Sequence, residues 1–446
     1  MKIIIAGAGD VGSHLAKLLS SESHDIYLID NNEERLNAIS SQIDVITITG
    51  DAKSVELMDQ KLISTSDLLI AVTSSEETNM LICILGKKLG ANHTIARIND
   101  DNIIKDNREH FYNELGIDTL ISPTHLATLE INRLINQAAF TDDIEFENGK
   151  LTVFGISLSE KSILINKTVR ESAGLNPNLS FKPLALHRDE FTLLVSGDTI
   201  LNENDIVYFI SQKECIEDII KLCGKTSIHI NNVMIIGGSK IGLNIAQLLE
   251  KNHQVTIVEK DKDKCEKIAS FLKKSLVINI DGHDVKQLEE EGLADMDALI
   301  SVTANSEMNV ITSLVGKKHG IKKTIARIEN FNYINLSQSI GIDTIINKKI
   351  IAADKIFKFV RKGNVSSVAN LHGTNAEIIE FVVKSNTKIT SKPINQLNFP
   401  SDSNIAGVIR NGIPIIPFGN FQLIENDKTI VFSLTESIKE IEKFFQ

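Results

Sequence analysis

Short apolar runs alternate with longer amphipathic stretches along the first 140 residues of the chain. The apolar runs are rich in Ile, Val and Leu, as is typical of β-strands, and read "KIIIAG", "DIYLID", "DVITITG", "LLIAVT" and "TIARI". The intervening stretches, such as "GSHLAKLLSSE" and "NMLICILGKKLG", have the spacing of helices with one apolar face. Because strands this apolar are buried on both faces, the pattern predicts a parallel sheet covered by helices, the doubly wound α/β fold of Rossmann-like dinucleotide-binding domains.

The same pattern returns 230 residues later. The segment "AVTSSEETNMLICILGKKLGANHTIARIND" (71–100) aligns without a gap with "SVTANSEMNVITSLVGKKHGIKKTIARIEN" (301–330), and 13 of the 30 positions are identical. The repeated unit has the length of a whole domain, so the chain is expected to contain two Rossmann-like domains.

A smaller segment with a different pattern of apolar and polar residues follows each of these domains. Its short alternating runs predict small α+β domains; they read "LTVFGISLS", "FTLLVSGD" and "DIVYFIS" in the first copy, and "AEIIEFVVK", "IAGVIRNGIPIIP" and "TIVFSL" in the second. Polar stretches such as "TDDIEFENGK" and "CGKTSIHINN" interrupt the periodicity at the boundaries. We therefore predict four domains, at residues 1–140, 141–228, 229–365 and 366–446.

Composition narrows the possible partners. The chain has 446 residues and a formal charge of -11, whereas a protein that binds nucleic acid or anionic lipid needs a basic face. No apolar run is long enough for a membrane helix, and Met1 and Lys2 lead directly into a strand rather than a signal peptide. The four cysteines lack the spacing of a zinc site. We therefore expect a cytoplasmic protein with no metal site, no nucleic-acid partner and no segment inserted in the membrane.

The first strand runs into a glycine-rich turn that opens a helix. In "GAGDVG" (7–12), Gly7 permits the tight turn, Gly9 lets the backbone approach a pyrophosphate, and Gly12 lets the helix pack on the strand. Ala8, Asp10 and Val11 complete the turn, whose helix N-terminus favours phosphate. Asp30 ends the second strand, where a carboxylate accepts both ribose hydroxyls and repels a 2′-phosphate. These positions predict NAD(H), or an adenosine nucleotide, rather than NADP.

The second copy departs from this pattern. Its turn keeps two of the three glycines but has serine in the middle and a lysine in place of Asp10. The residues of this turn and its strand-end carboxylate are Gly237, Gly238, Ser239, Lys240, Ile241, Gly242 and Glu259. Lys240 could offset phosphate charge, while Ser239 adds a Cβ where the pyrophosphate would approach. A second nucleotide site and a degenerate copy kept for packing both remain open.

Other polar residues follow strands at the edge where parallel sheets bind ligands. They are Asp51, Thr73, Ser74 and Arg97 in the first copy, and Asp281, Thr303, Ala304 and Arg327 in the second. Arg97 is a charge within an apolar strand, and either a ligand contact or a structural ion pair explains it. The histidines form no catalytic constellation, and the smaller segments carry no paired carboxylates in an apolar setting. We therefore expect a protein that binds a nucleotide as a signal, rather than an enzyme that uses the nucleotide in a reaction.

These motifs resemble a known family. "GAGDVG" with Asp30, then "AVTSSEETNM", "IARI" and "LISP", are similar to the TrkA family, in which RCK N-terminal and C-terminal domains (regulators of potassium conductance) occur in tandem. The resemblance covers the whole chain and implies a peripheral protein on the inner face of the membrane, partnered with a Trk-type potassium transporter. It also implies a ring of eight RCK units, hence a homo-tetramer of this chain, whose shape changes with nucleotide and gates the transporter.

The resemblance implies that the nucleotide contacts of the family lie at the turns, strand-end carboxylates and polar strand ends named above. ATP-sensing relatives with one RCK unit often have Arg where this chain has Asp10, which favours NAD(H) over ATP or ADP in the first site. The segments "PTHLATLEINRLINQAAF" (123–140) and "KKIIAADKIFKFVRKG" (348–363) have helical spacing. Each is either an ordinary packing helix or one that is swapped between neighbouring units. An NAD-dependent oxidoreductase and a regulator of a different cation transporter remain the alternative functions.

Overall fold

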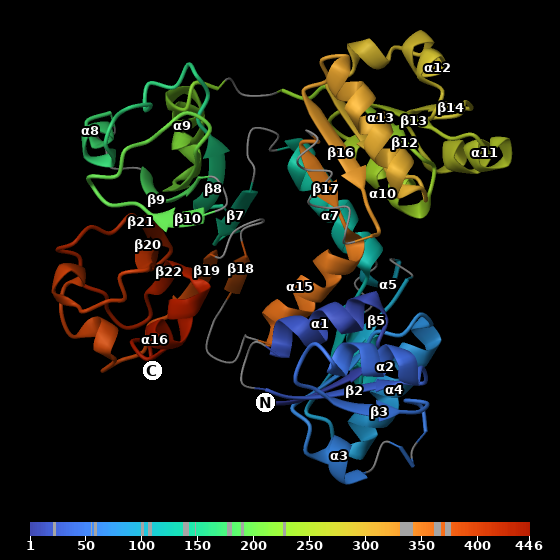
Figure 1. Ribbon diagram of the computed structural model, residues 1–446, viewed down its shortest axis with the longest axis horizontal. Coiled ribbons are helices and arrows are strands. Elements are labelled where there is room, and N and C mark those ends of the chain that lie inside the picture. Colours follow the sequence, from blue (N-terminus) through green and yellow to red (C-terminus); the bar gives the residue numbers. More distant parts are fainter. Residues whose placement is uncertain are drawn as a thin grey trace. The chain divides into compact units, whose positions relative to one another are not determined.

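The computed structural model places the chain in two compact units (Figure 1). Unit 1 comprises Met1–Asn136 and His229–Val360, and unit 2 comprises Gln137–Ile228 and Arg361–Gln446. The structure describes residues 1–20, 24–54, 56–57, 60–99, 102–105, 109–136, 142–147, 149–175, 181–188, 191–225, 229–330, 342–360, 367–370 and 376–446. Each unit therefore combines one segment from the first half of the chain (1–228) with one from the second half (229–446).

Unit 1 contains two six-stranded parallel sheets. The first has the order β3-β2-β1-β4-β5-β6 and the second β14-β13-β12-β15-β16-β17. The strands of the first are β1 Lys2–Ala6, β2 Asp25–Asp30, β3 Ile46–Thr49, β4 Leu68–Ala71, β5 His93–Arg97 and β6 Thr119–Ile121. Those of the second are β12 Asn232–Ile236, β13 Gln254–Val258, β14 Leu276–Ile278, β15 Ala298–Ser301, β16 Lys323–Arg327 and β17 Thr344–Ile346. This is the strand order of a Rossmann fold, which confirms the predicted fold class.

Helices connect the strands and cover both faces of each sheet. In the first half they are α1 Asp10–Ser20, α2 Glu33–Ser40, α3 Gln60–Ser64, α4 Glu76–Leu89, α5 Asn102–Lys105, α6 Glu109–Glu114 and α7 Pro123–Asn136. In the second half they are α10 Lys240–Leu249, α11 Lys262–Phe271, α12 Val285–Glu290, the 3-10 turn η2 Leu293–Asp295, α13 Ser306–Lys318 and α15 Lys348–Val360. Ile3, Ile4 and Ile5 are all fully buried, because consecutive side chains of β1 point to opposite covered faces.

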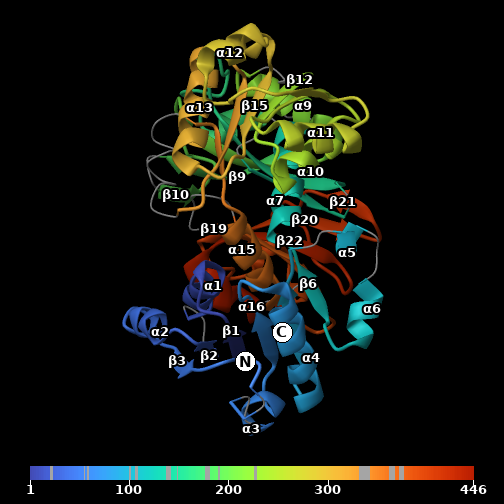
Figure 2. The same cartoon turned by 90° about the vertical axis from the view of Figure 1, so that its right-hand side faces the viewer.

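The two Rossmann-like domains exchange their last helices. Helix α15 of the second half packs on α1 of the first, and α7 of the first half packs on α10 of the second (Figures 1 and 2). Ala353 and Ile356 of α15 are fully buried in the same core cluster as Leu15 of α1. The segments 123–136 and 348–360 therefore join the two domains rather than closing their own, which is the swapped arrangement considered above.

Unit 2 contains two five-stranded antiparallel sheets, β10-β9-β11-β8-β7 and β18-β19-β22-β20-β21. Its elements in the first half are β7 Asp142–Phe146, β8 Leu151–Ser157, α8 Val169–Ala173, β9 Phe181–Arg188, β10 Phe191–Leu194, β11 Ile206–Ser211, η1 Lys213–Cys215 and α9 Ile216–Leu222. Those in the second half are β18 Ser367–Asn370, β19 Ala376–Val382, η4 Lys388–Thr390, η5 Ile394–Gln396, β20 Ser403–Arg410, β21 Ile413–Ile415, β22 Lys428–Leu434, η6 Thr435–Ser437 and α16 Ile438–Glu442.

A single apolar core joins the two small domains of unit 2. It contains Val153 and Tyr208 from the first half together with Ile378 and Phe432 from the second. The rings of Tyr208 and Phe432 meet with centroids 6.2 Å apart. Lys182 crosses the same interface and donates hydrogen bonds to the side-chain oxygen of Asn404, at 2.8 Å, and to a backbone carbonyl.

Unit 2 contains the motif Glu-Asn-Asp twice, at 203–205 and 425–427, and the motif has a structural role. Asp205 is 1 % exposed and accepts two hydrogen bonds of 2.7 Å from Arg188. Asp427 is equally buried and accepts two from Arg410. The asparagine before each aspartate has a positive φ, so the motif is a turn that holds a buried ion pair. None of the helices in the described ranges is long and apolar enough to cross a membrane.

Candidate nucleotide-binding sites

The glycine turn of the first half is held by the strand-end carboxylate. Gly7 has φ +110°, and a Cβ there would lie 2.9 Å from the backbone nitrogen of Thr73. One oxygen of Asp30 accepts a 2.6 Å hydrogen bond from the backbone N–H of Ala8, and the other accepts one of 2.8 Å from Asn32. Asp30 therefore fixes the turn, and each oxygen keeps a second lone pair for a ribose hydroxyl.

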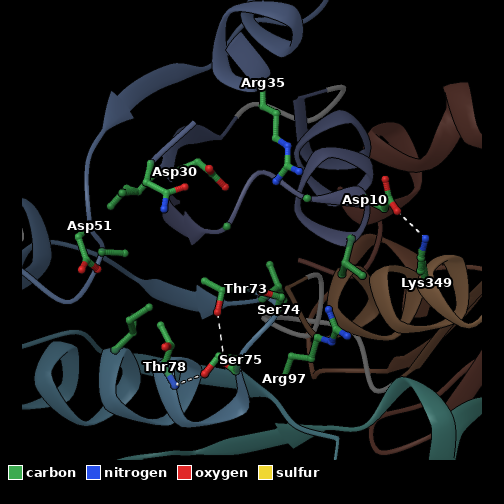
Figure 3. Close-up of a pocket in the computed structure, with 18 of the residues that line it drawn as sticks. Asp10, Asp30, Arg35, Asp51, Thr73, Ser74, Ser75, Thr78, Arg97 and Lys349 are labelled. Carbon is green, nitrogen blue, oxygen red and sulfur yellow. Dashed lines mark hydrogen bonds and ion pairs between the residues drawn. The ribbon is translucent and has the colours of Figure 1, made fainter. Parts of the chain in front are cut away.

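A cavity of about 490 Å³ lies at this turn, at the carboxyl edge of the first sheet (Figure 3). Nine predicted residues line it: Gly7, Gly9, Asp10, Val11, Asp30, Asp51, Thr73, Ser74 and Arg97. These residues lie at or just after the ends of strands, and the parallel sheet brings those ends to one edge.

The cavity fits a pyrophosphate ligand at two points. An ideal Cβ on Gly9 meets no atom within 4 Å, so the backbone of this residue faces open space into which a phosphate can approach. Arg97 has a buried Nε for which the described residues supply no partner. Burial lowers the pKa of Arg97, while the charge of Glu329 raises it. The cavity thus combines an accessible backbone turn with a guanidinium group available to an anion.

A buried asparagine holds in place two strand ends that line the cavity. Asn79 in α4 is 1 % exposed, and its side-chain oxygen accepts hydrogen bonds from the backbone N–H and the hydroxyl of Thr73, at 2.8 and 2.7 Å. Its amide nitrogen donates to the backbone carbonyl of Arg97 at 2.9 Å. Asn79 therefore ties the ends of β4 and β5 together, and Asn309 does the same in the second half.

Three residues of the second half complete the first cavity. Glu329 follows β16, and Lys348 and Lys349 begin α15, the exchanged helix. The ammonium group of Lys349 lies 2.5 Å from Asp10, as Figure 3 shows, and 3.2 Å from Glu329. Burial lowers the pKa of Lys349, but its bonds with Asp10 and Glu329 outweigh that effect, so the pKa is raised. The cavity is therefore composite, with one wall from each half of the chain.

The second half has a smaller cavity of about 240 Å³. The predicted residues that line it are Gly237, Ser239, Glu259, Asp281, Thr303 and Ala304. Glu259 reproduces the bonding of Asp30, since it accepts hydrogen bonds from the backbone N–H groups of Gly238 and Asp261, at 2.9 and 3.0 Å.

Seven predicted residues do not line either cavity. They are Ala8, Gly12, Gly238, Lys240, Ile241, Gly242 and Arg327. Gly12 lies against the turn itself, since a Cβ there would lie 1.8 Å from the carbonyl oxygen of Gly7. Lys240 was considered as a group that could offset phosphate charge, and its ammonium group donates to the carbonyl of Asn99. Arg327 is paired with Glu329, so the structural ion pair considered for Arg97 occurs instead at its counterpart.

Several residues that line the first cavity were not predicted from the sequence. They include Asn31, Arg35, Lys53, Ser75, Thr78, Pro123, Glu329, Lys348 and Lys349. Figure 3 shows Arg35 extending from α2 toward the turn. Repetition in both copies could have indicated Asn79, whereas the residues of the second half depend on the helix exchange. Within the described ranges, no cluster of His, Cys, Asp and Glu side chains could hold a metal ion.

Comparisons with known proteins agree with this architecture. Residues 3–123 and 233–348 match the TrkA-N domain, and residues 153–224 and 378–446 match the TrkA-C domain. The Trk system potassium uptake protein TrkA of Haemophilus influenzae is 31% identical over 452 residues, covering 100% of this chain and 99% of the relative.

Solved structures show the same fold. The RCK domain of GsuK has a TM-score of 0.61 at 15% identity and covers 100% of this chain and 94% of its own. The GsuK channel bound to NAD gives the same TM-score and identity, with 100% and 78% covered. Matches to both domain types, in tandem and along the whole length, confirm the predicted resemblance: the chain belongs to the TrkA family of Trk system potassium uptake proteins.

Proposed function

We propose that this chain is the nucleotide-sensing regulatory subunit of a Trk-type potassium transporter and not an enzyme. It would act at the inner face of the membrane, as a homo-tetrameric ring beneath the transporter's membrane subunit. The observation that carries the proposal is the composite first cavity, where Asp10 of the glycine turn contacts Lys349 of the other half. A ligand in a cavity with walls from two domains can favour one arrangement of those domains over another.

NAD(H) is the proposed ligand of the first cavity. Asp30 would accept the hydroxyls of the adenosine ribose, and the backbone of Gly9 with the N-terminus of α1 would hold the pyrophosphate. Arg97 would donate to a phosphate oxygen from the end of β5. NAD bound in these positions would present its charge and its shape to the residues of both halves that line the cavity. ADP and ATP share the adenosine and pyrophosphate parts but carry more negative charge on their terminal phosphates, which Asp10 would repel, so we propose that they bind less well.

The smaller cavity of the second half is proposed as a second nucleotide site. Glu259 would hold a ribose there, with Thr303 at the opposite edge. Its volume is about half that of the first cavity, and Ser239 stands where the first turn has glycine. These differences favour weaker binding at this position.

Isothermal titration calorimetry with NAD⁺, NADH, ATP and ADP tests the proposal. Asp30→Ala removes the first carboxylate, and Glu259→Ala is its matched control in the second half. We expect Asp30→Ala to abolish the tightest binding event and Glu259→Ala to leave it in place. Tight binding that survives Asp30→Ala but not Glu259→Ala would place the principal site in the second half, and no binding at all would refute nucleotide sensing.

Two alternative functions are distinguished by other measurements. An NAD-dependent oxidoreductase would change the absorbance of NADH in the presence of its substrate, whereas a sensor releases the cofactor unchanged. A regulator of a different cation transporter would not co-purify with a Trk-type membrane subunit. We expect no cofactor turnover and stable co-purification.

A further inference from the structure

Equivalent positions of the two glycine turns touch the opposite half of the chain with opposite charge. Asp10 contacts Lys349, and Lys240, which stands at the equivalent position of the second turn, donates a 2.6 Å hydrogen bond to the carbonyl oxygen of Asn99. Asn99 and Glu329 are themselves equivalent positions in the repeat. The halves therefore face each other through two related contacts, one between full charges and one between a charge and a neutral carbonyl.

Only the charged contact lies on the rim of a cavity. Asp10 and Lys349 both line the first cavity, whereas Lys240 lines neither. The Asp10 side chain is 62% exposed and that of Lys349 is 25% exposed. An ion pair as open as this contributes little to stability. Its main consequence is to hold an ammonium group beside the place where α1 begins.

Lys349 has two acidic neighbours that compete for it. Its ammonium group lies between Asp10, in the first turn of α1, and Glu329, 3.2 Å away. A phosphate held by the N-terminus of α1 would lie close to Asp10 and be repelled by it. The same phosphate would attract Lys349, because a phosphate oxygen is a strong acceptor for an ammonium donor.

We propose that Lys349 determines the ligand specificity of the first cavity, by exchanging its ion pair with Asp10 for a phosphate of the nucleotide bound there. This inference rests on the proposed nucleotide-binding function. Lys349 supplies positive charge from the second half, and Asp10 supplies the opposing negative charge from the first. The balance between these two charges permits a pyrophosphate to bind, and it weakens nucleotide binding as the ligand carries more phosphate charge. Because Lys349 begins α15, binding in the first cavity alters the contact between the halves.

The described residues of the second cavity do not make this connection. All its described lining residues, from Ile236 to Asn305, belong to the second half. A ligand in the first cavity would therefore contact residues of both halves, whereas the described lining of the second cavity comes from one half.

Calorimetry of the full chain with NAD⁺ and ADP tests this proposal. The variants are Lys349→Gln, Asp10→Asn and the double variant, with Lys318→Gln as a matched control on an exposed position of α13. Lys349→Gln should weaken ADP binding about tenfold, and NAD⁺ binding less, because ADP carries more negative charge. Asp10→Asn should tighten ADP binding severalfold, and the double variant should lie between them. Lys318→Gln should match the wild type.

The outcomes separate this inference from the proposed function. A wild-type chain that binds neither nucleotide overturns both. A wild-type chain that binds, with Lys349→Gln and Asp10→Asn unchanged in both affinities, overturns only the role of Lys349. If Lys349→Gln does not fold, Asp10→Asn still decides the question, since it removes the same ion pair from the exposed side. An ADP affinity that stays constant in Asp10→Asn then contradicts the proposal.

Discussion

The second and third glycines of the first turn, Gly9 and Gly12, should respond differently when each gains a side chain. At Gly9, an added Cβ meets no atom within 4 Å, whereas at Gly12 it would lie 1.8 Å from the carbonyl oxygen of Gly7. The second half provides an internal precedent, because Ser239 occupies the position of Gly9 with an ordinary φ of −71° and donates to the carbonyl of Val302. Gly9→Ser should therefore fold normally.

The magnitudes follow from these contacts. Gly9→Ser should change the free energy of unfolding by no more than about 0.5 kcal/mol, as for a substitution into open space. The substitution should remove at least one charge-assisted hydrogen bond between the ligand and the turn. Such a bond contributes about 1.5–3 kcal/mol, so the affinity should fall about ten- to hundredfold. Gly12→Ala forces α1 away from the turn and should destabilise the chain by about 1–3 kcal/mol or more.

Differential scanning fluorimetry and calorimetry with NAD⁺ separate the two effects. Gly9→Ser should keep the melting temperature of the wild type without ligand and lose the rise in melting temperature that NAD⁺ produces. Gly12→Ala should melt earlier even without ligand. A Gly9→Ser protein that binds NAD⁺ as tightly as the wild type would refute the proposed position of the pyrophosphate.

Three further predictions concern the packing of the two units. Ile356→Ala should destabilise unit 1 by about 2–5 kcal/mol, because this fully buried side chain fills the core of the other half; hydrogen exchange of β1 should rise, and unchanged protection there would contradict the helix exchange. Asp205→Asn should cost about 3 kcal/mol by leaving Arg188 without its carboxylate, and unaltered hydrogen exchange in β9 and β11 would count against this. Burial lowers the pKa of Lys182 to about 8, so between pH 8 and its unfolded pKa near 10.5 the unfolded chain binds more protons. Stability should therefore rise with pH across that window in the wild type, and Lys182→Met should flatten the rise in urea titrations.

The fold was predictable because its signals are local. The strands β1 and β4 are unbroken apolar runs, and each glycine turn stands directly between a strand and a helix. Nine of the residues that line the first cavity from its own half were also predictable; Asp30, for example, ends β2, and Thr73 follows β4. The topology of such a sheet brings these ends together without further information.

The remaining part of the site depends on tertiary contacts between the halves. Lys349 lies 339 positions from Asp10 in sequence, and no local pattern indicates that α15 packs on α1. The contact of Lys240 with the first half has the same origin. Its charge made it a candidate for a phosphate contact, and its hydrogen bond to the carbonyl of Asn99 depends on the approach of the first half.

Potassium flux tests the central claim, that a nucleotide in the first cavity regulates a Trk-type transporter. The chain would be reconstituted in liposomes with a co-purified Trk-type membrane subunit, and uptake would be measured with and without NAD⁺, NADH, ADP and ATP. We expect uptake to depend on nucleotide in the wild type and in Lys318→Gln, and to lose that dependence in Gly9→Ser. Uptake that responds equally to nucleotide in Gly9→Ser, or that never responds in the wild type, would contradict the account.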